Sequence, residues 1–349
     1  MSSLLICGPC SAESQEQVLQ TARFLVAHDV PVLRAGVWKP RTMPGQFEGY
    51  GEQALQWLAQ ARETTGIKIA TEVALPEHVE LCQRYDVDMV WLGARTTASP
   101  FAVQQLADAM RGYDKPVMVK NPINPDIHLW TGAIERLHNA GIQVKAAIHR
   151  GFSVNGETYY RYPPLWQIAK KLKTIYPQIL MIGDPSHMAG RSQLVPTIVQ
   201  QFVNRHYDGV MIECHPDPTS ARTDAQQQLN FAQMETLLTC LLSREEPKDK
   251  DELSLLRERI DDIDDRLLTL LHERLETVEQ LGAYKTLHKL SFSQPERFRH
   301  MLKQRLVWCK AHGMDEEFVS QLFQLIQKES IQRQQKTNND QPLSTAEEV

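Results

Sequence analysis

Six cationic side chains lie at, or shortly after, short runs of β-branched and aliphatic residues in the first part of the chain. They are Arg34, Lys39, Arg41, Arg95, Lys120 and Arg150. A single cation of this kind would be explained by an ion pair with a helix-borne acid. Six in equivalent places favour a bound polyanion, because buried cations without partners are costly and arginine forks match phosphate and carboxylate oxygens. The set predicts a small substrate that carries both groups.

A second group of side chains has the donor atoms of a metal site. It consists of Cys10, His187, Glu213 and Asp224. One thiolate, one imidazole and two carboxylates suit a single divalent ion such as Mn, Fe, Co or Zn, and do not suit a closed structural zinc site. An open coordination position would let this ion polarise a carbonyl. We therefore expect one divalent metal ion as cofactor.

The apolar runs alternate with amphipathic stretches over the first 242 residues, which predicts parallel βαβ units. The expected strands are Leu4–Cys7, Pro31–Arg34, Ile67–Thr71, Met89–Leu92, Val117–Lys120, Val144–His149, Ile179–Gly183 and Gly209–Glu213. The expected helices include Gln15–His28, Glu52–Thr65, Phe101–Arg111 and Arg191–Asn204. Eight units in about 240 residues are typical of a closed (β/α)8 TIM barrel, in which the carboxyl ends of all strands meet at one rim. A doubly wound open sheet is the alternative, and the lack of Gly-x-Gly-x-x-Gly after an early strand favours the barrel.

The pattern changes after residue 242. Residues 243–251 are charged and predict a linker. Apolar residues then recur at three- and four-residue steps, which predicts one long helix from Glu252 to about Leu287, a second from Pro295 and a third from Asp315. The expected domains are the barrel at 1–242, the linker at 243–251, an all-α domain at 252–336 and a disordered tail at 337–349.

The first of these helices is too long to bury its apolar stripe on two shorter ones, since it would span roughly 54 Å at 1.5 Å per residue. We therefore expect a homodimer through the helical domain. Arg274 and Lys285 share one helical face, because eleven residues give a net rotation of about 20°. Arg257 lies on another face and would reach the partner's site. Ser330 and Gln334, four residues apart, share a face of the last helix.

Composition excludes several other classes of protein. The net charge is −5, and residues 252–336 hold 14 Lys and Arg against 14 Asp and Glu, so neither part has the basic character of a nucleic-acid-binding module. The longest apolar run falls short of the roughly 18 residues that cross a membrane. The first residues lack the basic start of a signal peptide, and the six cysteines then favour free thiols in the cytoplasm.

Several motifs of the first domain carry a resemblance to a known family. They are GPCSAES, RAGVWKPRT, GAR, VMVK, HRGFS, DPSH, IECHPDP and ARTDAQQQL. Over residues 4–242 the chain resembles the 3-deoxy-D-arabino-heptulosonate 7-phosphate synthases, most closely the short-barrel (type I-beta-like) subgroup. The related 3-deoxy-octulosonate 8-phosphate synthases share the first motif and the overall plan. The KPRT element resembles an erythrose 4-phosphate site and argues against that alternative.

This resemblance implies a condensation of phosphoenolpyruvate with erythrose 4-phosphate. It implies that phosphoenolpyruvate is held by Arg34, Lys39, Arg95, Lys120 and Arg150. Arg41 and Thr42 would bind the aldose phosphate, and the metal would be held by the four ligands named above. Glu72 is a candidate for positioning the water that adds at C2, with a structural ion pair as its alternative role.

The helical region, with LRERIDDIDDRLLTLLHERLE, GAYK, PERF and QLFQLIQKESIQRQQ, resembles the all-helical chorismate mutases. The resemblance implies that chorismate or prephenate is bound by Arg257 of the partner subunit and by Arg274, Lys285, Gln294, Arg297, Ser330 and Gln334. Gln294 and Phe298 stand where that family usually has an aspartate and a glutamate. Gln294 still accepts a hydrogen bond, whereas Phe298 cannot.

Two functions remain open at this point. One is a bifunctional enzyme of aromatic amino-acid biosynthesis, with synthase and mutase activities. The other is a synthase whose helical domain is mainly a ligand-sensing dimerisation module. In either case we expect chorismate or prephenate, bound to the helical domain, to control the barrel allosterically.

Overall fold

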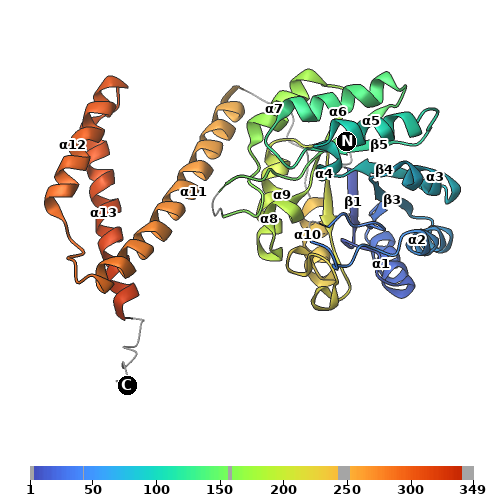
Figure 1. Ribbon diagram of the computed structural model, residues 1–349, viewed down its shortest axis with the longest axis horizontal. Coiled ribbons are helices and arrows are strands. Elements are labelled where there is room, and N and C mark those ends of the chain that lie inside the picture. The colour runs from blue at the N-terminus through green and yellow to red at the C-terminus, as the bar shows by residue number, and fades with distance from the viewer. Residues whose placement is uncertain (1–3, 42, 156–158, 243–251, 340–349) are drawn as a thin grey trace. The chain divides into compact units, whose positions relative to one another are not determined.

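The computed structural model describes residues 4–41, 43–155, 159–242 and 252–339. The chain divides into two compact units, Met1–Arg259 and Ile260–Val349. The first contains a closed parallel barrel with the strands in chain order (Figure 1). Its strands are β1 (Leu4–Gly8), β2 (Val32–Arg34), β3 (Lys68–Val73), β4 (Met89–Leu92), β5 (Val117–Lys120), β6 (Val144–His149), β7 (Leu180–Gly183) and β8 (Gly209–Glu213). The predicted (β/α)8 fold is confirmed.

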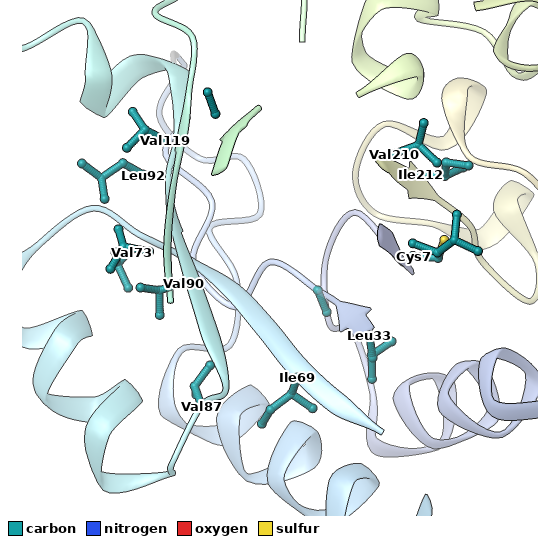
Figure 2. Packing of buried hydrophobic residues seen from close by; sticks show 14 of the residues in the cluster. Cys7, Leu33, Ile69, Val73, Val87, Val90, Leu92, Val119, Val210 and Ile212 are labelled. Atoms are coloured by element: carbon teal, nitrogen blue, oxygen red, sulfur yellow. The ribbon is translucent and has the colours of Figure 1, made fainter. Parts of the chain in front are cut away.

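The strands close into a barrel because side chains on both of their faces are buried. Successive residues point to opposite faces, so Ile6 of β1 packs inside the barrel with Met118 and Met211, while Cys7 packs outside against the helices. Figure 2 shows part of this outer layer, including Leu33 and Ile69. β1 pairs with both β2 and β8, which completes the ring.

Helices cover the outside of the barrel (Figure 1). They are α1 (Gln15–Ala27), α2 (Glu52–Thr65), α3 (Pro76–Arg84), α4 (Ala94–Thr97), α5 (Pro100–Ala109), α6 (Ile127–Asn139), α7 (Trp166–Ile175), α8 (Pro185–Ala189), α9 (Val195–Asn204) and α10 (Phe231–Leu242). Side-chain caps begin several of them: Ser14 accepts from the Gln17 N–H, and Asp126 from the His128 N–H. Helix α9 begins four residues later than expected, because residues 192–194 form a 3₁₀ turn ahead of Pro196.

The two short helices α4 and α8 matter for the site, since each begins directly after a strand. α4 follows β4 and carries Arg95; α8 follows β7 and carries His187. The Asp184 side chain accepts the His187 N–H at the start of α8. Both helices therefore hold their functional side chains at the carboxyl ends of the strands.

The helical part consists of α11 (Glu252–Leu287), α12 (Pro295–Ala311) and α13 (Glu316–Asn339). Gly313, in a left-handed conformation (φ +67°), follows α12, and Asp315 caps α13 by accepting the Phe318 N–H at 2.6 Å. Gly282 of α11 admits α13 closely, because a Cβ there would lie 3.0 Å from Gln334 Cα. α13 continues past the expected end at 336 as far as Asn339.

Residues 243–251 of the expected linker and 340–349 of the expected tail lie outside the described residues. None of the helices within the described ranges combines the length and the apolar character needed to cross a membrane.

Candidate active sites

The barrel rim gathers three of the four expected metal ligands. Ligand atoms of Cys10, Glu213 and Asp224 all lie within 4.8 Å of one another, and Cys10 Sγ donates to Asp224 Oδ2 at 3.2 Å. They converge because Cys10 follows β1 and Glu213 ends β8, two neighbouring strands. His187 adjoins this group through Glu213, with 3.8 Å between His187 Nε2 and Glu213 Oε1. Its Nδ1 contacts Asp184 at 2.8 Å.

The ionisation of these ligands fits a cation site. Burial, together with the charge of Glu213, raises the pKa of the Cys10 thiol to about 12. Burial opposes ionisation of Asp224, yet His187 and Arg161 hold the pKa of that carboxyl below its ordinary value. A soft sulfur donor beside two hard carboxylates is a mixed set that first-row divalent ions accept. The residues present therefore fit the expected metal.

Half of the expected substrate-binding cations already have anionic or thiol partners. Arg34 Nη1 lies 2.5 Å from Glu213 Oε1, and Lys120 Nζ lies 2.9 Å from Asp184 Oδ2. Lys39 Nζ donates to Cys10 Sγ and to the Cys10 carbonyl oxygen, each at 2.9 Å. The ion-pair explanation that the sequence leaves as the lesser alternative thus accounts for part of this rim.

Unused hydrogen-bonding capacity remains among the arginines. Arg34 Nε, Arg41 Nε and Arg150 Nη1 are buried without a hydrogen-bond partner in the part of the chain that the structure describes. Arg150 is 6% exposed and stacks on the Tyr162 ring at 3.6 Å. Burial lowers the pKa of its guanidinium. An anion placed here would satisfy these donors and offset their burial cost.

The three other expected barrel residues are Arg95, Thr42 and Glu72, of which the structure describes Arg95 and Glu72. Arg95 is exposed on α4. Thr42 lies outside the described residues. Glu72 is half-buried and accepts the indole N–H of Trp91 at 2.9 Å, and it packs so tightly that a Cβ on Gly93 would lie 2.2 Å from its Oε1.

Trp91 forms the floor of the site. Its ring lies 5.0 Å from Arg34 Cζ and 5.6 Å from Lys120 Nζ, and it is fully buried inside the barrel. An aromatic face below two cations contributes a cation–π attraction and keeps water away from them. In the sequence Trp91 lies within an apolar strand, so the residue pattern does not indicate that this tryptophan belongs to the site.

Sequence reasoning also missed two residues that contact the candidate metal ligands. Arg161 Nη1 donates to Asp224 Oδ1 at 2.8 Å, and Gln227 Nε2 donates to Glu213 Oε2 at 2.7 Å. Gln227 lies in the ARTDAQQQL motif, three residues after Asp224. This proximity in the sequence could have identified it as a candidate site residue. Arg161 lies between β6 and α7, away from any strand end, and no periodicity points to it.

The helical part brings together four of the expected mutase residues from α11 and α13. Arg274 Nη1 donates to Ser330 Oγ at 2.6 Å, and Lys285 Nζ donates to Gln334 Oε1 at 3.1 Å. Lys285 Nζ also donates to the Phe292 carbonyl at 3.0 Å. Burial and the charge of Arg297 lower the pKa of Lys285. Lys285, Ser330 and Gln334 are buried, so they form a buried polar cluster within one chain.

Other expected residues lie at or near the start of α12, or are not described. Arg297 is exposed on α12, and Gln294 stands at the start of that helix, where its carbonyl accepts the Phe298 N–H. The side chain of Arg257 lies outside the described residues. Arg305, which sequence reasoning did not select, contributes a further charge, since burial and Arg305 lower the pKa of Arg274.

The fold and the rim define a (β/α)8-barrel enzyme with a candidate anion and metal site at the carboxyl ends of its strands. The chain belongs to the DAHP synthetase I family, which it matches over residues 2–247. The chorismate mutase type II family matches residues 256–335. Both family resemblances expected from the motifs are confirmed.

Individual relatives agree with this division. The chain is 31% identical over 227 residues to a phospho-2-dehydro-3-deoxyheptonate aldolase of Thermotoga maritima, covering 65% of each chain. Its helical part is 36% identical over 86 residues to the bifunctional chorismate mutase/prephenate dehydratase of Escherichia coli K12, covering 25% of this chain and 22% of that protein. A crystal structure of the same-named Thermotoga maritima aldolase (DAHP synthase) superimposes with a TM-score of 0.62 at 27% identity, covering 69% of this chain and 68% of that one.

Proposed function

We propose that this protein is a bifunctional enzyme of aromatic amino-acid biosynthesis. Its barrel condenses phosphoenolpyruvate with erythrose 4-phosphate to 3-deoxy-D-arabino-heptulosonate 7-phosphate, and its helical part rearranges chorismate to prephenate. The observation that carries the first activity is a set of buried arginine donors without partners, on the same rim as a thiol–carboxylate cluster. The two matched families support the pairing of activities.

The cations of the rim divide between the two substrates. Arg34, Lys39, Arg95, Lys120 and Arg150 bind the phosphate and carboxylate of phosphoenolpyruvate. Arg41 and Thr42 bind the phosphate of the aldose. The free donor on Arg41 supports this division, and the KPRT element disfavours the octulosonate alternative.

Cys10, His187, Glu213 and Asp224 hold the divalent ion, which is Mn, Fe, Co or Zn. When bound, the ion supplies Lewis-acid polarisation of the aldehyde carbonyl. The short contacts that Lys39 and Arg34 make with Cys10 and Glu213 place the substrate cations directly beside the ligand set. Metal and phosphoenolpyruvate therefore occupy adjoining parts of one rim.

The chain's own residues then stabilise charge and position water. C3 of phosphoenolpyruvate attacks the aldehyde carbon, and buried guanidinium and ammonium groups stabilise the negative charge that develops. Water adds at C2, and phosphate leaves with cleavage of its C–O bond. Trp91 fixes Glu72 through Oε2, which leaves Oε1 to accept the proton of that water.

The mutase reaction needs no nucleophile and no proton transfer. Arg274 and the partner subunit's Arg257 bind the two carboxylates, with Arg297 and Ser330 supporting them and Gln294 accepting from the substrate hydroxyl. Lys285 and Gln334 donate to the ether oxygen, where negative charge develops as the C–O bond breaks. In the structure these two side chains bond to each other at 3.1 Å, so the ligand replaces that contact.

A second copy of the chain completes this site. Apolar side chains stand exposed along α11, among them Ile260 at 56% and Leu268 at 65%. Covering them in a homodimer would remove a large apolar surface from water. All six cysteines are free thiols, which supports a cytoplasmic location.

Phe298 favours the second candidate function, a helical part that mainly senses ligand and dimerises. It lies half-buried one turn beyond Gln294 and offers no hydrogen-bond acceptor for a substrate hydroxyl. A full-length protein that binds prephenate but does not convert chorismate would establish this alternative.

One experiment tests the whole proposal on the intact chain. Metal-stripped protein is given both barrel substrates, and loss of phosphoenolpyruvate is followed before and after Mn²⁺ is returned. The same two samples are assayed with chorismate. We expect condensation only with metal and equal mutase rates in both; condensation in the stripped protein would contradict the metal assignment.

A further inference from the structure

Arg161 and Gln227 connect the two carboxylates of the candidate metal site from behind. Arg161 Nη1 donates to Asp224 Oδ1 at 2.8 Å and to Gln227 Oε1 at 2.7 Å. Gln227 Nε2 in turn donates to Glu213 Oε2 at 2.7 Å. One continuous chain of hydrogen bonds therefore runs from one candidate ligand to the other without passing through Cys10.

These bonds occupy one particular oxygen of each carboxylate. Asp224 uses Oδ1 for Arg161, and its other oxygen, Oδ2, is the atom that lies 3.2 Å from Cys10 Sγ. Glu213 uses Oε2 for Gln227, and its Oε1 is the atom that lies 3.8 Å from His187 Nε2. In both acids the oxygen that faces another candidate ligand is not the one that this pair bonds. Glu213 Oε1 also accepts from Arg34 Nη1 at 2.5 Å.

The backbone around the pair is built to keep it in place. Asp224 has a left-handed φ of +47°, a conformation that a non-glycine residue keeps only when its surroundings hold it. The Gln227 N–H donates to the Asp224 carbonyl at 3.1 Å. Gly190 follows α8, and a Cβ there would lie 2.5 Å from Arg161 Cβ, so only glycine lets the Arg161 segment approach.

We propose that Arg161 and Gln227 act as one positioning unit that orients Asp224 and Glu213 for a divalent ion. This inference rests on the metal site of the proposed function. Neither residue is among the four expected ligands, and each bonds one of the two carboxylates, so both act through the carboxylates. The role goes beyond the four ligands, because it assigns the affinity for metal partly to two residues outside the ligand set.

Two physical effects of Arg161 oppose each other. Its positive charge repels a dication, whereas its hydrogen bonds fix the ligand geometry. The side chain is 43% exposed, so solvent screens the repulsion. Loss of hydrogen bonds that orient metal ligands typically weakens metal binding about 10- to 100-fold. Geometry therefore outweighs charge, and removing Arg161 weakens binding.

The test is titration of metal-stripped full-length protein with Co²⁺, followed by the thiolate-to-cobalt absorption band and by calorimetry. We expect Arg161→Met and Gln227→Met each to weaken Co²⁺ binding about 10- to 100-fold. The double variant should be little weaker than either single one, because both belong to one unit. Arg161→Gln keeps a donor without the charge and should recover part of the loss. A shifted absorption band would report altered ligand geometry, which a general loss of stability does not produce.

Arg191→Met is the matched control, since Arg191 is an exposed arginine stacked on Tyr159 at 5.1 Å. It should bind Co²⁺ as the unaltered protein does.

Cys10→Ala distinguishes a failure of the positioning unit from a failure of the metal site. If Cys10→Ala loses the band while Arg161→Met and Gln227→Met bind within twofold of the unaltered protein, the positioning unit is wrong and the metal site stands. If Cys10→Ala also binds normally, the metal site itself is wrong. Tighter binding by both Arg161→Met and Arg161→Gln would show that charge dominates and would overturn the inference.

Discussion

The two candidate sites of this chain differ in the partners of their cationic side chains. On the barrel rim the cations sit against anions: Arg34 against Glu213 and Lys120 against Asp184, with all four side chains buried. In the helical part the cations contact neutral oxygens, those of Ser330, Gln334 and Phe292. The barrel rim therefore balances part of its positive charge internally, whereas the helical site holds positive charge in excess.

The difference follows from the chemistry and from the scaffold. A closed barrel brings eight strand ends to one rim, so acids and cations from distant parts of the chain can be buried together. A metal-dependent condensation needs both kinds of charge. A pericyclic rearrangement needs only positive charge and donors at the breaking bond. Depressed pKa values at Arg274 and Lys285, caused by burial and by neighbouring cations, are the sign of that excess.

The largest expected effect separates the two sites completely. Cys10→Ala removes the sulfur ligand, so condensation should fall at least about 1,000-fold while the mutase rate stays near that of the unaltered protein. Phosphoenolpyruvate loss and chorismate loss are measured on the same metal-replete preparation. Cys240→Ala, at an exposed cysteine, is the control. Retained condensation in Cys10→Ala would mean that the rim does not depend on this thiol.

Lys285→Met tests the candidate mutase site of the helical part. Loss of a preorganised donor to developing charge should lower the mutase rate about 100- to 1,000-fold and leave condensation unchanged. The pKa of Lys285 lies below its ordinary value, so the charged form is lost at a lower pH than for a free lysine. The mutase rate should therefore fall as pH rises through that lowered pKa. Lys285→Arg, which stays charged, should retain its activity further into alkali; an identical pH profile would exclude Lys285 as the titrating group.

Arg41→Ala tests which barrel cations bind erythrose 4-phosphate and which bind phosphoenolpyruvate. Loss of a charge-assisted phosphate contact costs about 1.5–3 kcal/mol, or roughly 10- to 100-fold. The KM for erythrose 4-phosphate should rise by that factor, and the KM for phosphoenolpyruvate should change much less. Equal changes in both constants would remove Arg41 from the aldose site. Arg23→Ala, on the outer helix α1, serves as the control.

The smallest expected effect concerns communication between the two sites. Prephenate bound among Arg274, Lys285 and Gln334 should inhibit the condensation, because a coupling of about 1 kcal/mol already gives roughly fivefold inhibition. The synthase rate is measured against prephenate concentration for the unaltered protein and for Arg274→Ala. The variant should lose the response. Inhibition at the same concentration in both would place the sensor elsewhere, and none in either would leave the two activities independent.

Much of the architecture follows from the sequence alone. Seven of the eight strands, among them Met89–Leu92 and Val144–His149, have bounds predicted to within one residue at each end, and the long helix Glu252–Leu287 has the bounds expected for it. Periodicity is a local property, and alternation of strands with helices leaves few topologies. Once the barrel is inferred, the side chains at strand ends must share a rim. Cys10, Glu213 and Arg34 are therefore predicted from the sequence to lie on that rim.

Only the tertiary structure decided which of these side chains meet. Arg34 and Glu213 are 179 positions apart, and Cys10 and Asp224 are 214 apart, so no local pattern records either contact. Arg161 lies in a connecting segment and reaches the rim because α8 ends at Gly190. The pKa of about 12 for Cys10 likewise arises from burial and from Glu213. Desolvation and the electrostatic effects of nearby charges depend on distances in the folded chain. Local sequence patterns therefore do not predict these pKa shifts.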